Sequence, residues 1–211
     1  MKRQAAEPLR TVRVDSAQPD SVPIHAAAAV LGDGGVVAFP TETFYGLGAD
    51  ALNPKAVARI FKVKSRSASK PLLVLVDSVD MVVTIAADIP RAARVLMQRH
   101  WPGALTLVLP AQPHVPPEIT ARTGTVGVRL SPHPVARALV SALGRPITAP
   151  SANREGDPAP TTAAEVLAGL GDAVDFVLDG GATAGGAPST VIDVTTDPPR
   201  VLRDGAVRPC V

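Results

Sequence analysis

Short apolar runs, each about as long as one strand, alternate with helix-like segments along most of this chain. A continuous apolar run of this length, bounded by Gly or Pro, is typical of a strand that is buried on both faces. Strands separated by helices require a layered α/β or α+β architecture with a partly mixed sheet. The expected strands are 36–39, 72–76, 105–109, 126–130, 174–178, 190–194 and 200–203, with a further strand or loose segment at 11–14.

Length and charge limit the number of domains and the class of partner. The chain has 211 residues, 46% of them hydrophobic, which is enough for a substantial core. We expect one domain over 21–211, preceded by an N-terminal arm over 1–20. The formal net charge is only +2, which argues against a nucleic-acid coat protein but allows a local basic cleft for small anions.

Cysteine and histidine usage argues against disulfides and metal centres. The single cysteine, Cys210, cannot form an intrachain disulfide, and the four histidines show no paired metal-ligand spacing. We therefore expect no metal held by protein side chains. No apolar segment follows the basic N-terminus, and no run is long enough to span a membrane. These features predict a soluble cytoplasmic protein.

The first part of the chain predicts a strand–helix–strand unit. A helix begins at Ser21, strand 36–39 follows, and Asn53 caps a second helix that precedes strand 72–76. Such a unit normally places its strands as parallel neighbours with a right-handed crossover. The polar segment 41–48 would then lie at the carboxyl end of a strand, where α/β sheets bind ligands.

Capping signals place the later helices. One is expected from Asp88 to about Gln98, another over 133–143, and a third after Thr162, where Thr162 and Glu165 have the spacing of a capping box. The Pro-rich patch 110–117 is interpreted as a surface loop.

Two cations, Lys64 and Arg66, lie at the end of the helix that Asn53 caps. Arg66 offers a bidentate fork to phosphate oxygens, and Lys64 offers a compact charge. Such groups stabilise charge that develops at phosphorus. By itself, however, this pattern is more often a solvated helix end. Lys70 belongs either to the same patch or to a solvated turn.

The segment between strand 36–39 and Gly48 carries several polar groups. Thr41, Thr43 and Tyr45 supply hydroxyls, and Glu42 supplies a carboxylate. The two glycines that follow would let a ligand approach the backbone closely. An ordinary tight loop is an equally good interpretation.

A second polar pair, Ser151 and Asn153, follows a short apolar segment. Its neutral groups suit phosphate or ribose oxygens, but Ser and Asn also stabilise turns by bonding their own backbone. Ser189 follows the glycine-rich stretch 180–186, which is either a lid or a linker.

Arg129 lies inside the apolar run 126–130. A buried arginine needs an anionic partner, because an unpaired buried charge is very costly. A ligand carboxylate or an internal Asp or Glu would serve. Thr125 is placed to face the same cleft, and Arg203 is either a third cation of the site or an exposed strand residue.

Taken together, these segments resemble the YrdC/TsaC family of L-threonylcarbamoyladenylate synthases, in its short form without a second domain. The resemblance covers about residues 21–207 and rests on several motifs in the same order. They are FPTETFYGLGADAL (39–52), KSR and KPL (64–72), WPGALTLVL (101–109), TVGVRLSPHPVA (125–136), TAPSANREGDPAPTT (148–162), STVIDV (189–194) and VLRDGAV (201–207).

The resemblance implies a fold, a reaction and partners. The fold would be α/β, a twisted open mixed sheet flanked by helices, with a concave, positively charged cleft. The reaction would join L-threonine, bicarbonate or CO2, and ATP into threonylcarbamoyl-AMP and pyrophosphate, with Mg²⁺ carried on the phosphates. The product would serve N6-threonylcarbamoyladenosine formation next to the anticodon of tRNA, through a separate transferase.

The resemblance also assigns roles to residues. The signature groups around the nucleotide phosphates, taken as catalytic, would be Lys64, Arg66, Ser151 and Asn153. The ATP side would further include Lys70, Thr125 and Arg203. The threonine side would comprise Thr41, Thr43, Tyr45, Arg129, the backbone of Ala149, and Ser189, with Arg129 pairing the threonine carboxylate.

Two other functions fit parts of the same pattern. A module that grips tRNA or double-stranded RNA without chemistry would use the same cleft, although aromatic residues make up only 3% of the chain. A carbamoyl-transfer enzyme that uses carbamoyl phosphate would share the fold, but such chains are larger and cysteine-rich.

Overall fold

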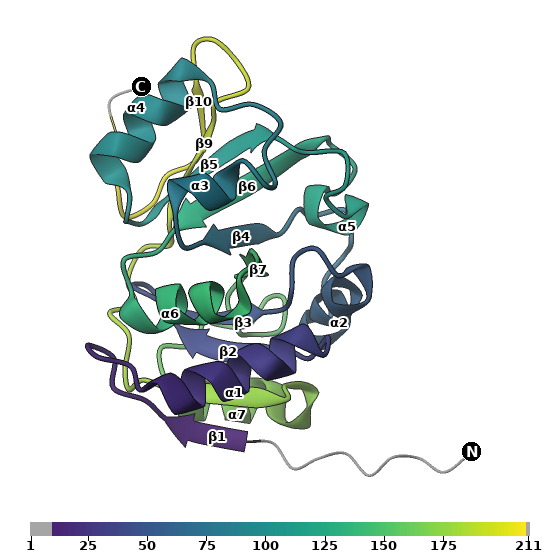
Figure 1. Ribbon diagram of the computed structural model, residues 1–211, viewed down its shortest axis with the longest axis vertical. Coiled ribbons are helices and arrows are strands. Elements are labelled where there is room, and N and C mark those ends of the chain that lie inside the picture. Colours follow the sequence, from purple (N-terminus) through teal and green to yellow (C-terminus); the bar gives the residue numbers. More distant parts are fainter. Residues whose placement is uncertain (1–9, 210–211) are drawn as a thin grey trace.

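Ten strands form two separate sheets over residues 10–209, which are the residues that the computed structural model describes (Figure 1). The smaller sheet has the order β1-β8-β2-β3, and the larger has the order β10-β9-β5-β6-β4-β7. Residues 1–9 of the predicted arm, and Cys210, lie outside the described residues. The strands are β1 (Arg10–Arg13), β2 (Val37–Pro40), β3 (Tyr45–Gly48), β4 (Leu73–Val76), β5 (Leu105–Pro110), β6 (Thr125–Leu130), β7 (Ile147–Thr148), β8 (Phe176–Asp179), β9 (Thr190–Asp193) and β10 (Arg200–Arg203).

Both sheets mix parallel and antiparallel neighbours. In the smaller sheet β1, β8 and β2 run parallel, and β3 is antiparallel to β2. In the larger sheet β5–β9 and β4–β6 are parallel pairs, whereas β9–β10, β5–β6 and β4–β7 are antiparallel. The predicted α/β class and mixed strand directions are confirmed, but two open sheets form where one was expected.

The strand–helix–strand unit predicted for the first part of the chain is wrong. Its two strands, β2 and β4, lie in different sheets. After β2 the chain reverses in a tight turn, and β3 returns antiparallel with Pro40 opposite Tyr45. Because β3 occupies the free edge of β2, no parallel neighbour can pair there, and the following helix carries the chain to the larger sheet instead.

The segment around β7 ties the two sheets together. On one side, the Leu47 N–H of β3 donates to the Pro150 carbonyl at 2.8 Å. On the other side, the Ala149 N–H donates to the Leu73 carbonyl at 2.8 Å. The loop that continues from this segment, with Ser151 at its start, is therefore anchored to both sheets.

The helices cover the outer faces of the sheets. α1 and α6 lie side by side (Figure 1) and share a core cluster that includes Leu31 and Leu139. The predicted capping box of α7 is confirmed, because the Thr162 side chain accepts from Glu165 N and the Glu165 side chain accepts from Thr162 N. The helices are α1 (Ser21–Gly32), α2 (Pro54–Lys64), α3 (Val79–Val82), α4 (Arg91–His100), α5 (Pro117–Thr120), α6 (Pro134–Leu143) and α7 (Ala163–Leu170).

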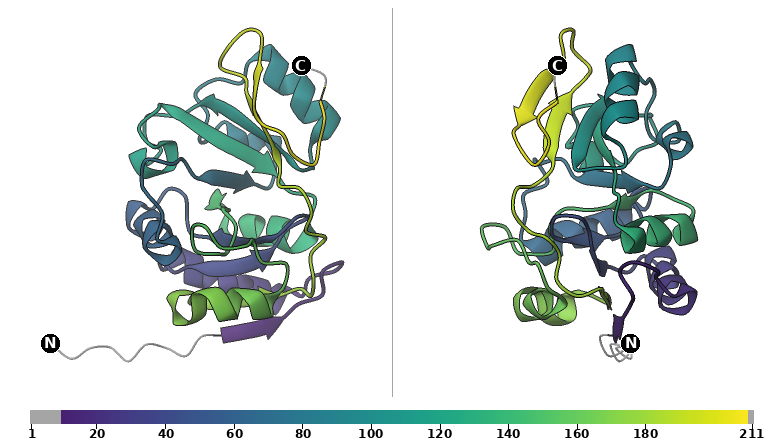
Figure 2. Two further views of the ribbon diagram at one scale, coloured as in Figure 1. Left: turned by 180° about the vertical axis from the view of Figure 1, so that it is seen from behind. Right: turned by 90° about the vertical axis from the view of Figure 1, so that its left-hand side faces the viewer.

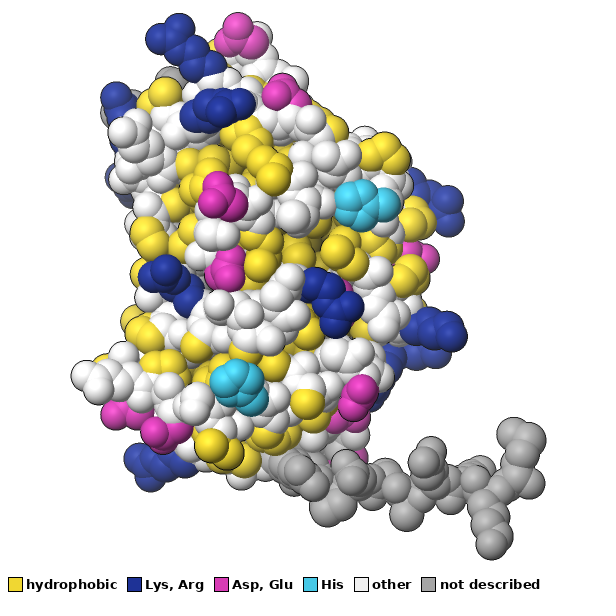
Figure 3. Space-filling model, viewed as in Figure 1, with side chains coloured by type: hydrophobic (Ala, Val, Ile, Leu, Met, Phe, Trp, Pro, Cys, Tyr) yellow, Lys and Arg dark blue, Asp and Glu magenta, His cyan; other side chains and the backbone are white. Residues whose placement is uncertain are grey.

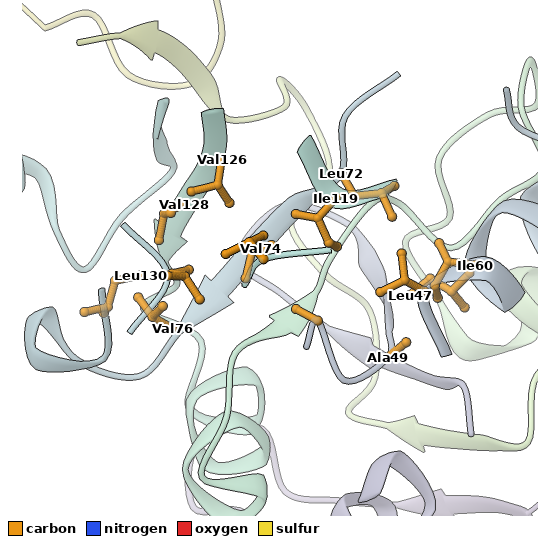
Figure 4. Packing of buried hydrophobic residues seen from close by; sticks show 14 of the residues in the cluster. Leu47, Ala49, Ile60, Leu72, Val74, Val76, Ile119, Val126, Val128 and Leu130 are labelled. Carbon is orange, nitrogen blue, oxygen red and sulfur yellow. The ribbon is translucent and has the colours of Figure 1, made fainter. Parts of the chain in front are cut away.

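The main core cluster brings together residues of both sheets. Figure 4 shows Leu47 of β3 next to Ile60 of α2, and Val76 of β4 next to Leu130 of β6. All four side chains are buried. Their packing accounts for the continuous apolar runs in the sequence, since a strand covered on both faces has no solvent side for polar residues.

The glycines of β3 make room for an aromatic ring. A Cβ on Gly48 would lie 2.9 Å from Cε1 of Phe39, and one on Gly46 would lie 3.1 Å from its Cζ. Phe39 is fully buried on the neighbouring strand. The Gly-x-Gly pattern was expected to form a turn, and its place inside a strand is therefore a correction.

We expect Gly48→Ala to lower the free energy of unfolding by about 1–3 kcal/mol, the usual cost of overpacking a filled core. The new methyl group must displace the Phe39 ring, which is fully buried. Gly169→Ala in α7 is the matched control, because nothing lies within 4 Å of its Cβ position. Urea unfolding of both variants measures the difference, and equal stabilities would contradict this packing role.

Candidate active site

A cavity of about 640 Å³ is lined by residues of both sheets and of the loops between them. All but two of the predicted site residues line it. Lys64 and Asn153 are the exceptions. The residues on the wall are Thr41, Thr43, Tyr45, Arg66, Lys70, Thr125, Arg129, Ala149, Ser151, Ser189 and Arg203.

Arg129 is held on the cavity wall by an internal carboxylate. It lies on β6, only 3% exposed, and its Nη1 is 2.8 Å from Oε1 of Glu42. The second oxygen of Glu42 accepts from the Ser131 hydroxyl at 2.5 Å. Burial lowers the pKa of Arg129, and the charge of Glu42 opposes that effect. The buried arginine therefore has the internal partner that its setting requires.

One donor of the same guanidinium remains without a partner. Nε of Arg129 is buried and makes no hydrogen bond among the described residues. A buried, unsatisfied N–H costs about 1–3 kcal/mol. Since Arg129 also lines the cavity, an anion bound there could satisfy this group.

The turn between β2 and β3 places two threonines at the cavity. The Thr41 hydroxyl donates to the Phe44 carbonyl at 2.7 Å, which closes the turn, and it lies 3.3 Å from the Thr43 hydroxyl. The Thr43 carbonyl accepts from Gly185 N at 2.7 Å. Thr41 is therefore used by the turn itself, whereas the Thr43 hydroxyl keeps hydrogen-bonding capacity for a ligand.

Tyr45 lines the cavity but uses its hydroxyl elsewhere. The hydroxyl donates to the Gly181 carbonyl at 2.7 Å and accepts from Gly180 N at 3.2 Å. Burial, followed by the charge of Asp179, raises the pKa of Tyr45 to about 12. Tyr45 thus holds the start of the segment that runs from the smaller sheet to the larger one (Figure 2).

Ser189 and Arg203 form a second polar group on the larger sheet. Arg203 Nη2 donates to the Ser189 carbonyl at 2.7 Å and to its hydroxyl at 3.1 Å. The Ser189 hydroxyl is also 2.9 Å from that of Thr106. Arg203 lies close enough to Arg129 for its charge to lower the pKa of Arg129 further. Two cations therefore approach one another on this wall.

Lys64 stands behind the wall rather than on it. Its side chain is buried, and Nζ donates to the Ser151 carbonyl at 2.5 Å and to the Asn153 carbonyl at 2.6 Å. Burial, and then the charge of Arg66, lowers the pKa of Lys64 to about 8. This lysine couples the end of α2 to the Ser151–Asn153 loop, which the spacing of the two motifs did not reveal.

Arg66 and Lys70 are two further cations that line the cavity. Arg66 Nη2 donates to the Pro71 carbonyl at 3.0 Å, and its Nε is buried without a partner among the described residues. Lys70 pairs with Glu155 at 2.5 Å. Ser65, which directly precedes Arg66, adopts φ 50°, so the chain leaves α2 through a left-handed residue that turns Arg66 away from the helix.

Asn153 stabilises its own loop, as the turn interpretation predicted. Its Nδ2 donates to the carbonyls of Arg154 and Asp157, at 2.9 and 2.7 Å. Its Oδ1 is buried and without a partner among the described residues. The neighbouring Ser151 forms a bridge with Gly46 of β3 and lines the cavity.

Thr106, Glu155 and Glu42 were not among the predicted site residues. Thr106 is a polar residue inside the apolar run of β5, the same signal that singled out Arg129. Glu155 follows Asn153 closely but carried no motif of its own. Glu42 was noted as a carboxylate, yet its pairing with Arg129 joins residues that are far apart in sequence and depends on how the sheets are placed.

Within the described range, no group of three or more His, Cys, Asp or Glu side chains could hold a metal ion. None of the described helices has the length and apolar character needed to cross a membrane.

Known proteins resemble this chain over most of its length. Residues 29–205 match the Sua5/YciO/YrdC family model, which is described as telomere recombination. The threonylcarbamoyl-AMP synthase of Pyrococcus abyssi is 46% identical over 184 residues, or 87% of this chain and 54% of that protein. The threonylcarbamoyl-AMP synthase of Thiobacillus denitrificans is 39% identical over 175 residues, which are 83% of this chain and 92% of that protein.

A solved structure shows the same fold. The crystal structure of P. abyssi Sua5 complexed with L-threonine has a TM-score of 0.89 and 44% identity, covering 94% of this chain and 58% of that one. The chain thus spans about half the length of its P. abyssi relative. Because the family model matches most of the chain, including every residue that lines the cavity, the chain belongs to the Sua5/YciO/YrdC family.

Proposed function

We propose that this chain is a threonylcarbamoyl-AMP synthase, which makes L-threonylcarbamoyl-AMP and pyrophosphate from L-threonine, bicarbonate or CO2, and ATP. The observation that carries the proposal is Arg129, a buried arginine with one internal carboxylate and one unused donor on the wall of a cavity. Relatives named for this activity, one of them covered almost over its full length, support it.

The threonine side of the cavity would be the wall around Arg129. The free Nε–H of Arg129 suits a carboxylate, since charge-assisted bonds from arginine are short and strong. The Thr43 hydroxyl and the pair Ser189–Thr106 lie on the same cavity and suit the hydroxyl and amine of threonine. The structure of P. abyssi Sua5 complexed with L-threonine supports threonine as the ligand class of this fold.

The nucleotide side would be the wall around Arg66 and Lys70, with Ser151 beside it. No acidic residue of the described part of the chain lines the cavity, so we propose that the cleft is positively charged. Lys64, behind the residues that line the cavity, would hold the Ser151 loop in place and add its positive charge to the field at the phosphates. Thr125 and Arg203 complete the proposed ATP-binding set.

The chemistry needs no protein nucleophile. The threonine amine adds to the carbon of CO2 and loses a proton, which gives a carbamate. A carbamate oxygen then attacks the α-phosphorus of ATP, the bond to the β-phosphate oxygen breaks, and pyrophosphate leaves. Positioning and charge stabilisation by the arginines would supply most of the rate. Mg²⁺ would be bound by the phosphates and would keep several of its waters, since the protein side chains that line this part of the cavity are cations.

The product would serve tRNA modification. Threonylcarbamoyl-AMP carries an activated carbonyl, and a separate transferase would pass it to adenosine next to the anticodon of tRNA. A cytoplasmic location follows from that role as part of the proposal.

A product assay tests the function directly. Purified protein with threonine, bicarbonate, ATP and Mg²⁺ should yield threonylcarbamoyl-AMP by mass spectrometry, and pyrophosphate only when threonine is present. The competing function, RNA binding without chemistry, would give salt-dependent RNA affinity and no threonine-dependent product. On the face in Figure 3, Lys and Arg are interspersed with Asp and Glu among the described residues, which does not favour an extended RNA surface.

The affinity for Mg·ATP should fall as the pH rises above about 8. Lys64 has a pKa lowered to about 8, so its charge is present below that pH and is lost above it. A neutral amine attracts phosphate less and leaves the Ser151 loop less firmly held. Calorimetric titrations with Mg·ATP between pH 7 and 9.5 measure the change, and Lys64→Arg should flatten it. An affinity that stays constant in the unmodified protein would contradict the role of Lys64.

A further inference from the structure

Glu155 places a carboxylate against the cations of the proposed phosphate site. Its Oε1 lies 2.5 Å from Lys70 Nζ, and the two residues are 85 positions apart in sequence. The backbone holds this carboxylate in place independently of Lys70, because Glu155 N donates to the Lys64 carbonyl at 2.8 Å. The contact therefore joins the loop after β7 to the end of α2.

Several groups besides Lys70 act on the same carboxylate. The pKa of Glu155 is lowered, first by the hydrogen bond from Lys70, and also by the Ser67 N–H and the charge of Arg66. Arg66 and Lys70 both line the cavity. Two neighbouring cations of this kind also suit a phosphate group.

We propose that the Glu155 carboxylate is an internal anion that pairs with the cations of the phosphate site. The phosphates of a nucleotide must displace this carboxylate when they bind, so that Glu155 sets the affinity for ATP. This inference rests on the proposed ATP site.

The exposure of the pair makes such an exchange feasible. The side chains of Lys70 and Glu155 are 58% and 33% exposed, whereas those of Arg129 and Glu42 are 4% and 15% exposed. An exposed ion pair contributes little to stability and can open readily. A buried pair such as Arg129–Glu42 is costly to break. The two carboxylates thus have different roles: Glu42 permanently positions Arg129, and Glu155 competes with the ligand.

The test uses equilibrium binding, so that it does not depend on turnover. Inorganic tripolyphosphate and Mg·ATP are titrated into the full chain and into Glu155→Gln by calorimetry, without threonine or bicarbonate. Glu155→Gln should bind both probes about two- to fivefold more tightly, the range expected for removing one exposed ion pair. The gain should shrink as salt is raised, because exposed charges are screened.

Matched variants separate this effect from a general change of charge. Asp157→Asn removes an exposed acid of the same loop that has no ion pair among the described residues, and it should leave both affinities unchanged. In a Lys70→Gln background, Glu155→Gln should tighten binding by a smaller factor than in the unmodified chain. Thermal melting of each variant confirms that the fold persists. Glu155→Ala, made as a separate variant, provides a second substitution at the same position.

Three results would overturn the inference. The first is unchanged or weaker binding of tripolyphosphate in Glu155→Gln, or no binding by either protein. The second is weaker Mg·ATP binding with a raised Mg²⁺ requirement, which would make Glu155 a metal ligand instead. The third is an equal gain in Asp157→Asn. A protein without threonine-dependent product would refute the proposed function but would not affect this measurement.

Discussion

Arg129→Gln should lower kcat/KM for threonine by about 10²- to 10³-fold, the range for truncating one partner of a buried charge pair. The substitution removes a buried guanidinium that faces the cavity with an unused donor. The affinity for Mg·ATP should change far less, because Arg66 and Lys70 remain. Initial rates over a range of threonine concentrations, at saturating ATP, measure the effect.

The stability of this variant must be separated from its activity. Arg129→Gln leaves the carboxylate of Glu42, which is 15% exposed, without its cationic partner, and an unpaired buried charge destabilises a fold by about 3–5 kcal/mol. The double variant Arg129→Gln/Glu42→Gln should recover the melting temperature and stay inactive. Arg137→Gln, an exposed position on α6, is the control. Recovery of activity in the double variant would show that Arg129 acts only through the fold.

Lys64→Ala and Arg66→Ala should each lower turnover by about 10²- to 10³-fold, the scale for losing one charge-stabilising donor. Only Lys64→Ala should also lower the melting temperature. It leaves the carbonyls of Ser151 and Asn153 without their donor, and an unsatisfied buried group costs about 1–3 kcal/mol. For a chain of this size each kcal/mol shifts the melting temperature by about 2–4 °C.

Lys62→Ala is the matched control for both changes. Lys62 lies in the same last turn of α2 but points to solvent, so its loss should leave turnover and melting temperature nearly unchanged. Calorimetric melting and the product assay on all three variants give the comparison. Equal losses of stability in Lys64→Ala and Arg66→Ala would contradict the distinction between a buried connector and a cavity ligand.

Local chemistry was sufficient to predict most of the individual elements. The Asn53 cap and the capping box at Thr162 and Glu165 depend on bonds within one turn of helix, and both form as predicted. The short strands β3 and β7 were missed. β3 is half glycine and forms because Phe39 fills the space beside it, which is a contact between two strands rather than a preference of one.

The sequence alone determined the α/β class, most of the helix and strand positions, and nearly all of the polar side chains that line the cavity, because these follow from local pattern and motif. Only the tertiary structure decided how they are arranged. It separated the strands into two sheets, since the turn at Thr41 sent β3 back along β2. It placed Lys64 behind the wall, and it paired Arg129 with Glu42 and Lys70 with Glu155. These charges lie far apart along the chain, so burial and geometry select their partners.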